Sequence, residues 1–208
     1  MGIRAMARRT RFERATLRIG IWYSIQLSYR RMQRNQYTIF YPRCKGEKSI
    51  FEEFFHPKGR FMFSLRQTTS STEQTEKIAS DFAKYLLDEG KTDAFLAMYG
   101  DLGAGKTAFV RGLGSVIAPT CAVSSPTYAI VNEYRGDQVT LCHFDMYRIT
   151  SEDDLLGIGF YDYEDCIIAA EWCENIPYAL PEKYLRVEIK KTSYDTPDER
   201  EVSITLEA

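Results

Sequence analysis

The sequence predicts an α/β protein with a mixed sheet flanked by helices, and three features support this prediction. An unbroken apolar run at residues 94–99 is typical of a buried parallel strand. A glycine-rich segment at 100–107 follows it directly, and apolar residues continue from residue 108 at helical spacing. A second fully apolar run at residues 166–170 predicts another buried strand.

Two helices are predicted from periodicity and from signals at their ends. Residues 72–89 repeat apolar side chains on one face, as in an amphipathic helix. Ser71 and Gln74 fit a capping box at its start, and Gly90 fits its end. The second helix is expected at residues 106–117, directly after the glycine-rich segment.

Two hairpins are predicted from strand-like segments that flank turn signals. Residues 128–134 and 138–144 lie on either side of Arg-Gly-Asp at 135–137, which favours a hairpin. Residues 185–189 and 202–206 alternate enough to form a closing hairpin at the end of the chain.

Charge divides the chain into two unlike parts. Residues 1–61 carry 14 Lys and Arg against 4 Asp and Glu, whereas residues 62–208 carry 13 against 25. We therefore expect a basic N-terminal extension at 1–61, which is disordered, and a folded domain at 62–208.

Three interpretations compete for residues 1–61. An Arg-rich, acid-poor start is typical of an organellar transit peptide or of a nucleic-acid-binding arm. In the third interpretation the start is mis-assigned, because residues 58–61 admit a purine-rich coding before Met62 that resembles a bacterial ribosome-binding site. We favour the third.

Cysteine, histidine and apolar content exclude several classes of protein. The five cysteines form no C-x-x-C pair, and with only two histidines the sequence offers no zinc site. We interpret the thiols as reduced core residues of a cytoplasmic protein. No run approaches the roughly 20 apolar residues that span a bilayer, so we expect no membrane segment.

Residues 100–107, Gly-Asp-Leu-Gly-Ala-Gly-Lys-Thr, fit the phosphate-loop pattern G-x-x-x-x-G-K-[ST]. Its glycines let backbone N–H groups turn toward phosphate oxygens, and the following helix points its positive end at the same anion. We expect Lys106 to face solvent and reach the β- and γ-phosphates, and the Thr107 hydroxyl to bind Mg²⁺. The pattern predicts a P-loop NTPase-like fold that binds a nucleoside triphosphate.

A phosphate-loop ATPase needs a second carboxylate near the metal, usually at the end of a buried strand. Glu171 follows five apolar residues and fits this position, at the edge where open α/β sheets bind ligands. The alternative is a solvated glutamate at a strand end.

Further candidates lie in His-Phe-Asp-Met-Tyr-Arg at 143–148 and in a loop before it. If the strand persists, alternation sends His143, Asp145 and Tyr147 to one face. Asp145 then orients the attacking water or holds magnesium through water, and the alternative is a structural His/Asp/Arg network. Thr127 lies on a loop after the phosphate-loop helix, the position of a switch threonine that senses the γ-phosphate, and the alternative is an ordinary Ser-Pro-Thr turn.

Four motifs, in their order and spacing, resemble the bacterial TsaE family: G-D-L-G-A-G-K-T at 100–107, S-P-T-Y at 125–128, H-F-D-M-Y-R at 143–148 and E-W at 171–172. The resemblance spans residues 62–208 and has no counterpart for residues 1–61. This strengthens the interpretation that the start is mis-assigned. Members of this family are small ATPases that act with the TsaB and TsaD proteins in making threonylcarbamoyladenosine beside the anticodon of tRNA. The resemblance implies a slow ATP hydrolase that reaches tRNA indirectly, through TsaB and TsaD.

The resemblance also implies roles for the matching residues. Trp172 matches a family tryptophan associated with activity, and the base-side contacts fall near residues 72–75 and Arg200. Ala108 departs from the family, in which many members carry a second threonine. The implied roles are ATP binding for Gly103, Ala104, Gly105, Lys106, Thr107, Ala108 and Arg200, Mg²⁺ binding for Thr107 and Glu171, and catalysis for Lys106, Thr127 and Asp145.

Other classes of protein compete with this one. A GTPase of the common kind carries N-K-x-D for guanine, and the sequence has none. A small-molecule kinase needs an arginine-bearing lid, and residues 173–183 offer only Lys183, although Arg148 is a candidate for an arginine finger. The basic N-terminus favours a nucleic-acid-binding module, whereas the acidic remainder should not bind tRNA unaided.

Overall fold

The structure, a computed structural model, describes residues 38–39, 52–55, 61–193 and 195–207. The chain divides into two units at residue 39. Of the first unit, strand β1 (Thr38–Ile39) is the part described. The expectation of a disordered extension falls mainly outside the described residues, and the boundary at Met62 stays a prediction.

The second unit alternates strands and helices along the chain. Four short 3₁₀ helices follow β6, α4 and β7: η1 (Met146–Arg148), η2 (Phe160–Asp162), η3 (Cys173–Asn175) and η4 (Pro177–Ala179). The main elements are β2 (Glu52–Phe55), β3 (Phe61–Thr69), α2 (Thr72–Asp88), β4 (Phe95–Tyr99), α3 (Lys106–Ile117), β5 (Val131–Arg135), β6 (Thr140–Asp145), α4 (Glu152–Gly157), β7 (Cys166–Glu171), β8 (Tyr184–Lys191) and β9 (Arg200–Glu207).

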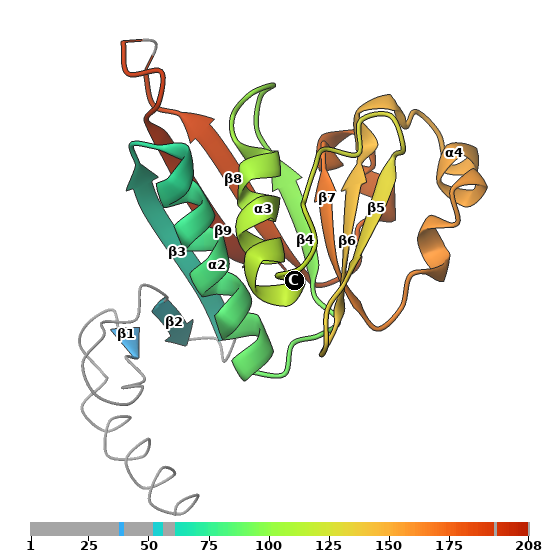
Figure 1. The fold of residues 1–208 in the computed structure, drawn as a ribbon, viewed down its shortest axis with the longest axis horizontal. Helices are drawn as coiled ribbons and strands as arrows, with labels where there is room; N and C mark the ends of the chain where they lie inside the picture. The colour runs from blue at the N-terminus through green and yellow to red at the C-terminus, as the bar shows by residue number, and fades with distance from the viewer. Residues whose placement is uncertain (1–37, 40–51, 56–60, 194, 208) are drawn as a thin grey trace, which may run out of the picture. The chain divides into compact units, whose positions relative to one another are not determined.

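The strands of this unit form one mixed sheet in the order β2-β3-β9-β8-β4-β7-β6-β5 (Figure 1). Its centre, β8-β4-β7-β6, is parallel, and the strands on both sides of this centre pair antiparallel. Helices α2 and α3 lie side by side over one face of the sheet. The predicted α/β fold with a mixed sheet flanked by helices is confirmed.

Most elements form where the sequence predicts them. Helix α3 has the predicted bounds, α2 ends one residue before the predicted end, and both hairpins are present. Strand β5 begins only at Val131, because Ile130 has a φ of +69° and interrupts the extended backbone. Strand β3 and helix α4 were not predicted, although Ser151 and Asp154 form a capping box at the start of α4.

The ends of α2 show how local signals set an element. Ser71 caps the helix by accepting a hydrogen bond from the Gln74 N–H. The predicted capping box is incomplete, because the Gln74 side chain accepts from the Ser70 N–H rather than from that of Ser71. At the other end Gly90 has a φ of +65°, and the N–H groups of Gly90 and Lys91 donate back to the last turn, which completes a Schellman motif.

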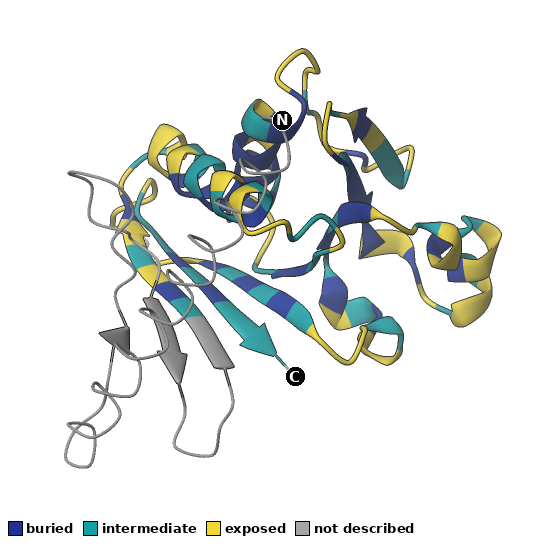
Figure 2. Cartoon of the chain, turned by 90° about the horizontal axis from the view of Figure 1, so that it is seen from below, coloured by how far each residue is buried: buried dark blue, intermediate teal, exposed yellow. Residues whose placement is uncertain are grey.

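Hydrophobic packing covers the sheet in two clusters. The larger cluster lies between the sheet and helices α2 and α3, and Phe82 and Phe109 are fully buried in it. The second contains Phe144 of β6, which packs edge-on against Phe160. Figure 2 shows buried residues alternating with less buried ones along β8 and β9, whereas β6 and β7 are buried over most of their length.

The cysteines that the structure describes form no disulfide bonds. Cys142, Cys166 and Cys173 are buried and free, and burial raises the pKa of Cys173 to about 12. Cys121 is exposed, which corrects the expectation of a core residue, because it lies in the loop after α3. Cys44 lies outside the described residues.

None of the helices in the described part of the chain combines the length and the hydrophobicity that a membrane-spanning helix requires.

Helices α2 and α3 pack tightly against each other at Gly112 of α3. A Cβ at this position would lie 2.2 Å from the Glu76 carbonyl oxygen and 2.6 Å from Ala79 Cβ. These distances are far below a van der Waals contact, so the crossing of α2 and α3 requires a residue without a side chain.

We predict that Gly112→Ala lowers the free energy of unfolding by about 1–3 kcal/mol, because the added methyl group forces the two helices apart. Gly157→Ala in α4 is the matched control, since a Cβ there meets nothing within 4 Å. It should be neutral or raise the free energy of unfolding by up to about 1 kcal/mol through helix propensity. Urea denaturation of both variants checks this, and equal effects would show that the helix crossing is not tightly packed.

Candidate functional site

The glycine-rich loop connects the end of β4 to the start of α3. Gly103 and Gly105 have φ values of +72° and +116°, a region that residues with a side chain rarely adopt. Gly105 is the N-cap of α3 and has no capping side chain. The first N–H groups of α3 therefore point into the loop, where an anion can accept their hydrogen bonds.

Lys106 lies beneath this loop and is buried, with 4% of its surface exposed. Its Nζ donates to the carbonyl oxygens of Gly100 and Asp101, the latter at 3.1 Å. The expectation of a solvent-facing lysine is wrong. The side chain can be buried because the loop carbonyls supply the acceptors that a buried ammonium needs. Burial lowers the pKa of Lys106, and the surrounding carboxylates oppose this shift.

Trp172 closes the site beside Lys106. The Lys106 Nζ lies 3.8 Å from the centroid of the Trp172 ring. The centroids of the Tyr147 and Trp172 rings are 5.1 Å apart. Trp172 has a φ of +63°, which strains the backbone of a bulky residue. The Asn175 amide fixes the neighbouring turn by donating to the Met146 carbonyl at 3.0 Å. Trp172 is thus held in a costly conformation with its indole against the ammonium.

Glu171 lies at the carboxyl end of β7, as predicted. It pairs with Met98 of β4 on one side and with Asp145 of β6 on the other. It is buried rather than solvated, with 4% exposed. The Thr107 hydroxyl donates to Glu171 Oε1 at 2.8 Å, and His143 Nε2 lies 2.9 Å from the same oxygen. The end of β7 is therefore joined directly to the start of α3.

Asp145 ends β6 and holds the loop that contains Thr127. The Thr127 hydroxyl donates to Asp145 Oδ2 at 2.9 Å, and Ser125 Oγ lies 2.7 Å from Thr127 Oγ1. Oδ1 accepts from the Tyr147 N–H at 3.1 Å, so Asp145 also caps η1. Because the strand ends here, Tyr147 leaves the face that His143 and Asp145 share, and it is exposed.

Arg148 is bound to the same loop. Its guanidinium donates to the carbonyl oxygens of Thr127 and Tyr128, the second at 3.1 Å. These contacts place Arg148 behind Thr127, and it is not among the residues that line the cavity described next.

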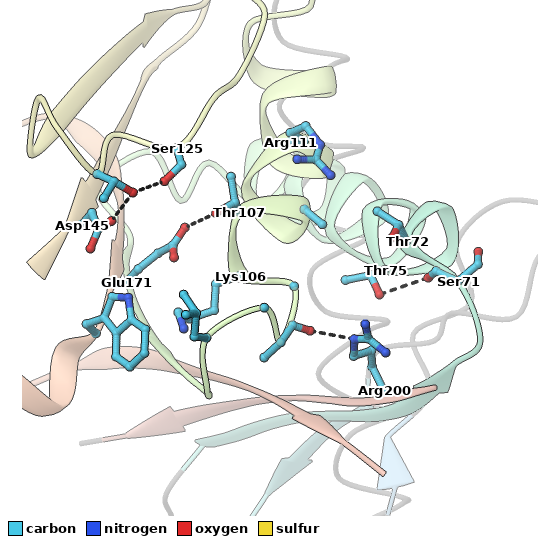
Figure 3. Close-up of a pocket in the computed structure, with 17 residues that line it drawn as sticks. Ser71, Thr72, Thr75, Lys106, Thr107, Arg111, Ser125, Asp145, Glu171 and Arg200 are labelled. Carbon is cyan, nitrogen blue, oxygen red and sulfur yellow. Dashed lines mark hydrogen bonds between the residues drawn. The ribbon is translucent and has the colours of Figure 1, made fainter. Parts of the chain in front are cut away.

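A cavity of about 300 Å³ brings the predicted site residues together (Figure 3). Arg200 lies across the cavity from Glu171, and its Nε donates to the Ala104 carbonyl at 2.9 Å. Three further side chains line it: Ser71, expected only as a helix cap, Ser125, expected only as part of the S-P-T-Y motif, and Arg111, which no motif marks. All predicted site residues line the cavity, namely Gly103, Ala104, Gly105, Lys106, Thr107, Ala108, Thr127, Asp145, Glu171 and Arg200.

The donor atoms fit a hard cation that takes part of its coordination from a ligand. Among the described residues, no three His, Cys, Asp or Glu side chains gather into a preformed metal site. The Thr107 hydroxyl, 2.8 Å from Glu171 Oε1, and the Glu171 carboxylate supply oxygen donors of the kind that Mg²⁺ prefers. Mg²⁺ commonly binds proteins through one or two such groups, together with phosphates and water.

A mixed sheet with a parallel centre, a glycine-rich loop between a central strand and a helix, and a buried lysine beside that loop define a P-loop NTPase-like α/β protein. A family model described as threonylcarbamoyl adenosine biosynthesis protein TsaE matches residues 69–202. The chain belongs to the TsaE family.

Relatives cover the same part of the chain. The tRNA threonylcarbamoyladenosine biosynthesis protein TsaE of Bacillus subtilis is 35% identical over 144 residues, which are 69% of this chain and 87% of the relative. The protein of the same name from Haemophilus influenzae is 36% identical over 131 residues, 62% of this chain and 83% of the relative. The crystal structure of Bacillus subtilis YdiB superimposes with a TM-score of 0.55 at 28% identity, covering 72% of this chain and 89% of that one.

The strained backbone at Trp172 predicts an unusual order of stabilities. Trp172→Gly should have a free energy of unfolding about 1 kcal/mol higher than Trp172→Ala, because both lose the indole but only alanine retains the steric cost of a positive φ. At exposed Tyr147 the order should reverse by about 0.5–1 kcal/mol, since glycine there only adds freedom to the unfolded chain. Urea denaturation of the four variants decides, and the same order at both positions would contradict the strain.

Proposed function

We propose that this protein is a Mg²⁺-dependent ATPase required for the formation of threonylcarbamoyladenosine in tRNA, and that it acts with TsaB and TsaD in the cytoplasm. The proposal rests on one observation: Lys106, Thr107 and Glu171 line the same cavity at the phosphate loop. Membership in the TsaE family supports a role in threonylcarbamoyladenosine synthesis.

The phosphates of ATP would bind in the loop itself. Backbone N–H groups from Gly103 to Thr107 and the N-terminus of α3 offer donors and positive potential. Lys106 would exchange the Gly100 and Asp101 carbonyls for the β- and γ-phosphates. Ala108 would add a backbone donor at the α-phosphate but no hydroxyl.

The base-side part of ATP would lie toward the other end of the cavity. That end is lined by Arg200 and by residues 71, 72 and 75 at the start of α2. The Arg200 guanidinium is already oriented by its bonds to the Ala104 and Glu199 carbonyls, so a ligand would meet a fixed planar surface.

Thr107 and Glu171 would hold Mg²⁺. A hydroxyl that donates its proton to Glu171 keeps its oxygen lone pairs for a cation. The bound ion would neutralise charge on the transferring phosphoryl group.

Asp145 and Thr127 would act on the attacking water. Asp145 is a buried carboxylate at the end of β6, next to Glu171 in the sheet register. It can accept a hydrogen bond from water and orient it in line with the γ-phosphate, while Thr127 senses that group from the loop. Attack of water on the γ-phosphorus breaks the bond to the bridging oxygen and yields ADP, phosphate and a proton.

The charge of the domain supports coupling to partners. Residues 62–208 carry 25 acidic against 13 basic side chains, so this part gains little from neutralising tRNA phosphates. We propose that TsaB and TsaD supply the contact with tRNA, and that slow hydrolysis of ATP controls the association with them.

We predict that Lys106→Ala abolishes ATP hydrolysis, because the ammonium that binds the phosphates is lost. The fold should stay intact, because the substitution also removes the cost of burying a charge. Lys183→Ala is the matched control, since Lys183 is exposed and lies outside the cavity. Phosphate release and circular dichroism are the measurements. Hydrolysis near the wild-type rate in Lys106→Ala would refute the assigned site.

We predict that the tagged protein captures TsaB and TsaD in the presence of ATP, and that Lys106→Ala captures less of both, because the nucleotide state controls docking. Pull-down with ATP, with ADP and without nucleotide measures this dependence. Capture that is identical in all three conditions would contradict nucleotide-controlled docking, even if the protein hydrolyses ATP.

A further inference from the structure

His143 is buried in β6 beside Glu171. Its side chain has no exposed surface, and Nε2 lies 2.9 Å from Glu171 Oε1. The contact crosses from β6 to β7, where His143 is in register with Ala169 and Asp145 with Glu171. The other ring nitrogen, Nδ1, is buried and has no hydrogen-bond partner among the described residues. His143 thus makes its one side-chain hydrogen bond to the carboxylate proposed to bind Mg²⁺.

These contacts determine where the imidazole carries its proton. A carboxylate oxygen only accepts hydrogen bonds, so the ring nitrogen that faces it must donate. A proton on Nδ1 would leave a buried donor without an acceptor in the described part of the protein, which is strongly unfavourable. The geometry therefore requires a proton on Nε2, the nitrogen that faces Glu171.

The hydrogen bonds to Glu171 all end on one oxygen. Thr107 Oγ1 and His143 Nε2 both donate to Oε1, and no hydrogen bond from a described residue ends on Oε2. Thr107 lies on the phosphate loop and lines the cavity, whereas His143 belongs to the sheet and does not line it. His143 is thus the donor that the core of the protein holds in place.

We propose that His143 is a positioning residue for the cation site. Its Nε2–H holds Glu171 Oε1, so that the carboxylate keeps a fixed rotation and presents its other oxygen to Mg²⁺. This inference rests on the proposed function, because it requires that Thr107 and Glu171 bind a Mg²⁺-nucleotide. A histidine that only filled space in the sheet would affect stability but would not change how strongly magnesium assists nucleotide binding.

Two amide substitutions separate the positioning role from packing. In His143→Gln the amide nitrogen can occupy the place of Nε2 and still donate to Glu171. In His143→Asn the shorter amide reaches only the place of Nδ1, and the donor to Glu171 is lost. The affinity for ADP, measured by calorimetry on the full chain with excess Mg²⁺ and again with EDTA, gives the magnesium enhancement as the ratio of the two dissociation constants. Glu171→Ala supplies the reference for a lost carboxylate.

We expect His143→Asn to lower the magnesium enhancement by about 10- to 100-fold, toward the value of Glu171→Ala, with the affinity in EDTA unchanged. His143→Gln should keep most of the enhancement. An undiminished enhancement in His143→Asn, or an equal loss in both amides, would overturn the role of His143 and leave the cation site standing. A wild-type protein without any enhancement would instead overturn the proposed magnesium site.

A measurement on the wild-type protein tests the same proposal without a substitution. Long-range ¹H–¹⁵N correlation spectra report which imidazole nitrogen carries the proton, and the sequence contains one other histidine, His56. Comparison with His143→Gln assigns the signals. We expect a proton on Nε2 of His143. A ring without a proton on Nε2 would overturn the proposal, because the donor to Glu171 would then be absent.

Discussion

The parallel register of β4, β7 and β6 is the constraint on which the site depends. Met98 pairs with Glu171, and Glu171 pairs with Asp145, so the loop that follows β4 meets both carboxylates at the same edge of the sheet. A slip of one residue in β7 would replace Glu171 by Ala170 and turn every side chain of the strand to the opposite face. The buried apolar residues that fix this register therefore also fix the geometry of the site.

Burying ionisable side chains at this edge of the sheet costs free energy and requires a specific partner for each of them. Lys106, His143, Asp145 and Glu171 are all buried there, and each has a partner: loop carbonyls for Lys106, Glu171 for His143, and hydroxyls for the two carboxylates. Buried charges without such partners would destabilise the protein by several kcal/mol. Two carboxylates beside one ammonium leave an excess of negative charge, which favours a cation.

Local signals were sufficient to predict the fold class, α3, both hairpins and the residues of the loop, because glycines and apolar runs act over a few residues. They were insufficient for β3, whose pairing partner β9 lies at the far end of the chain. The partner of His143 was missed for a similar reason, since the contact to Glu171 depends on the pairing of β6 with β7. The burial of Lys106 could not be predicted, because carbonyls of the folded loop and an indole from another element create it.

The two sides of the cavity are held by different means. Glu171 and His143 belong to central strands, and their contacts change only if the sheet changes. Thr127 belongs to an exposed loop that is held by Asp145 and Arg148 and that ends at Ile130, where a β-branched residue has a φ of +69°. Strain of this kind and exposed hydrogen bonds give a segment lower local stability than a buried strand. A ligand that bridges the two sides would therefore meet a fixed carboxylate at β7 and act chiefly on the loop, which is an arrangement that couples ligand binding to a change at the protein surface.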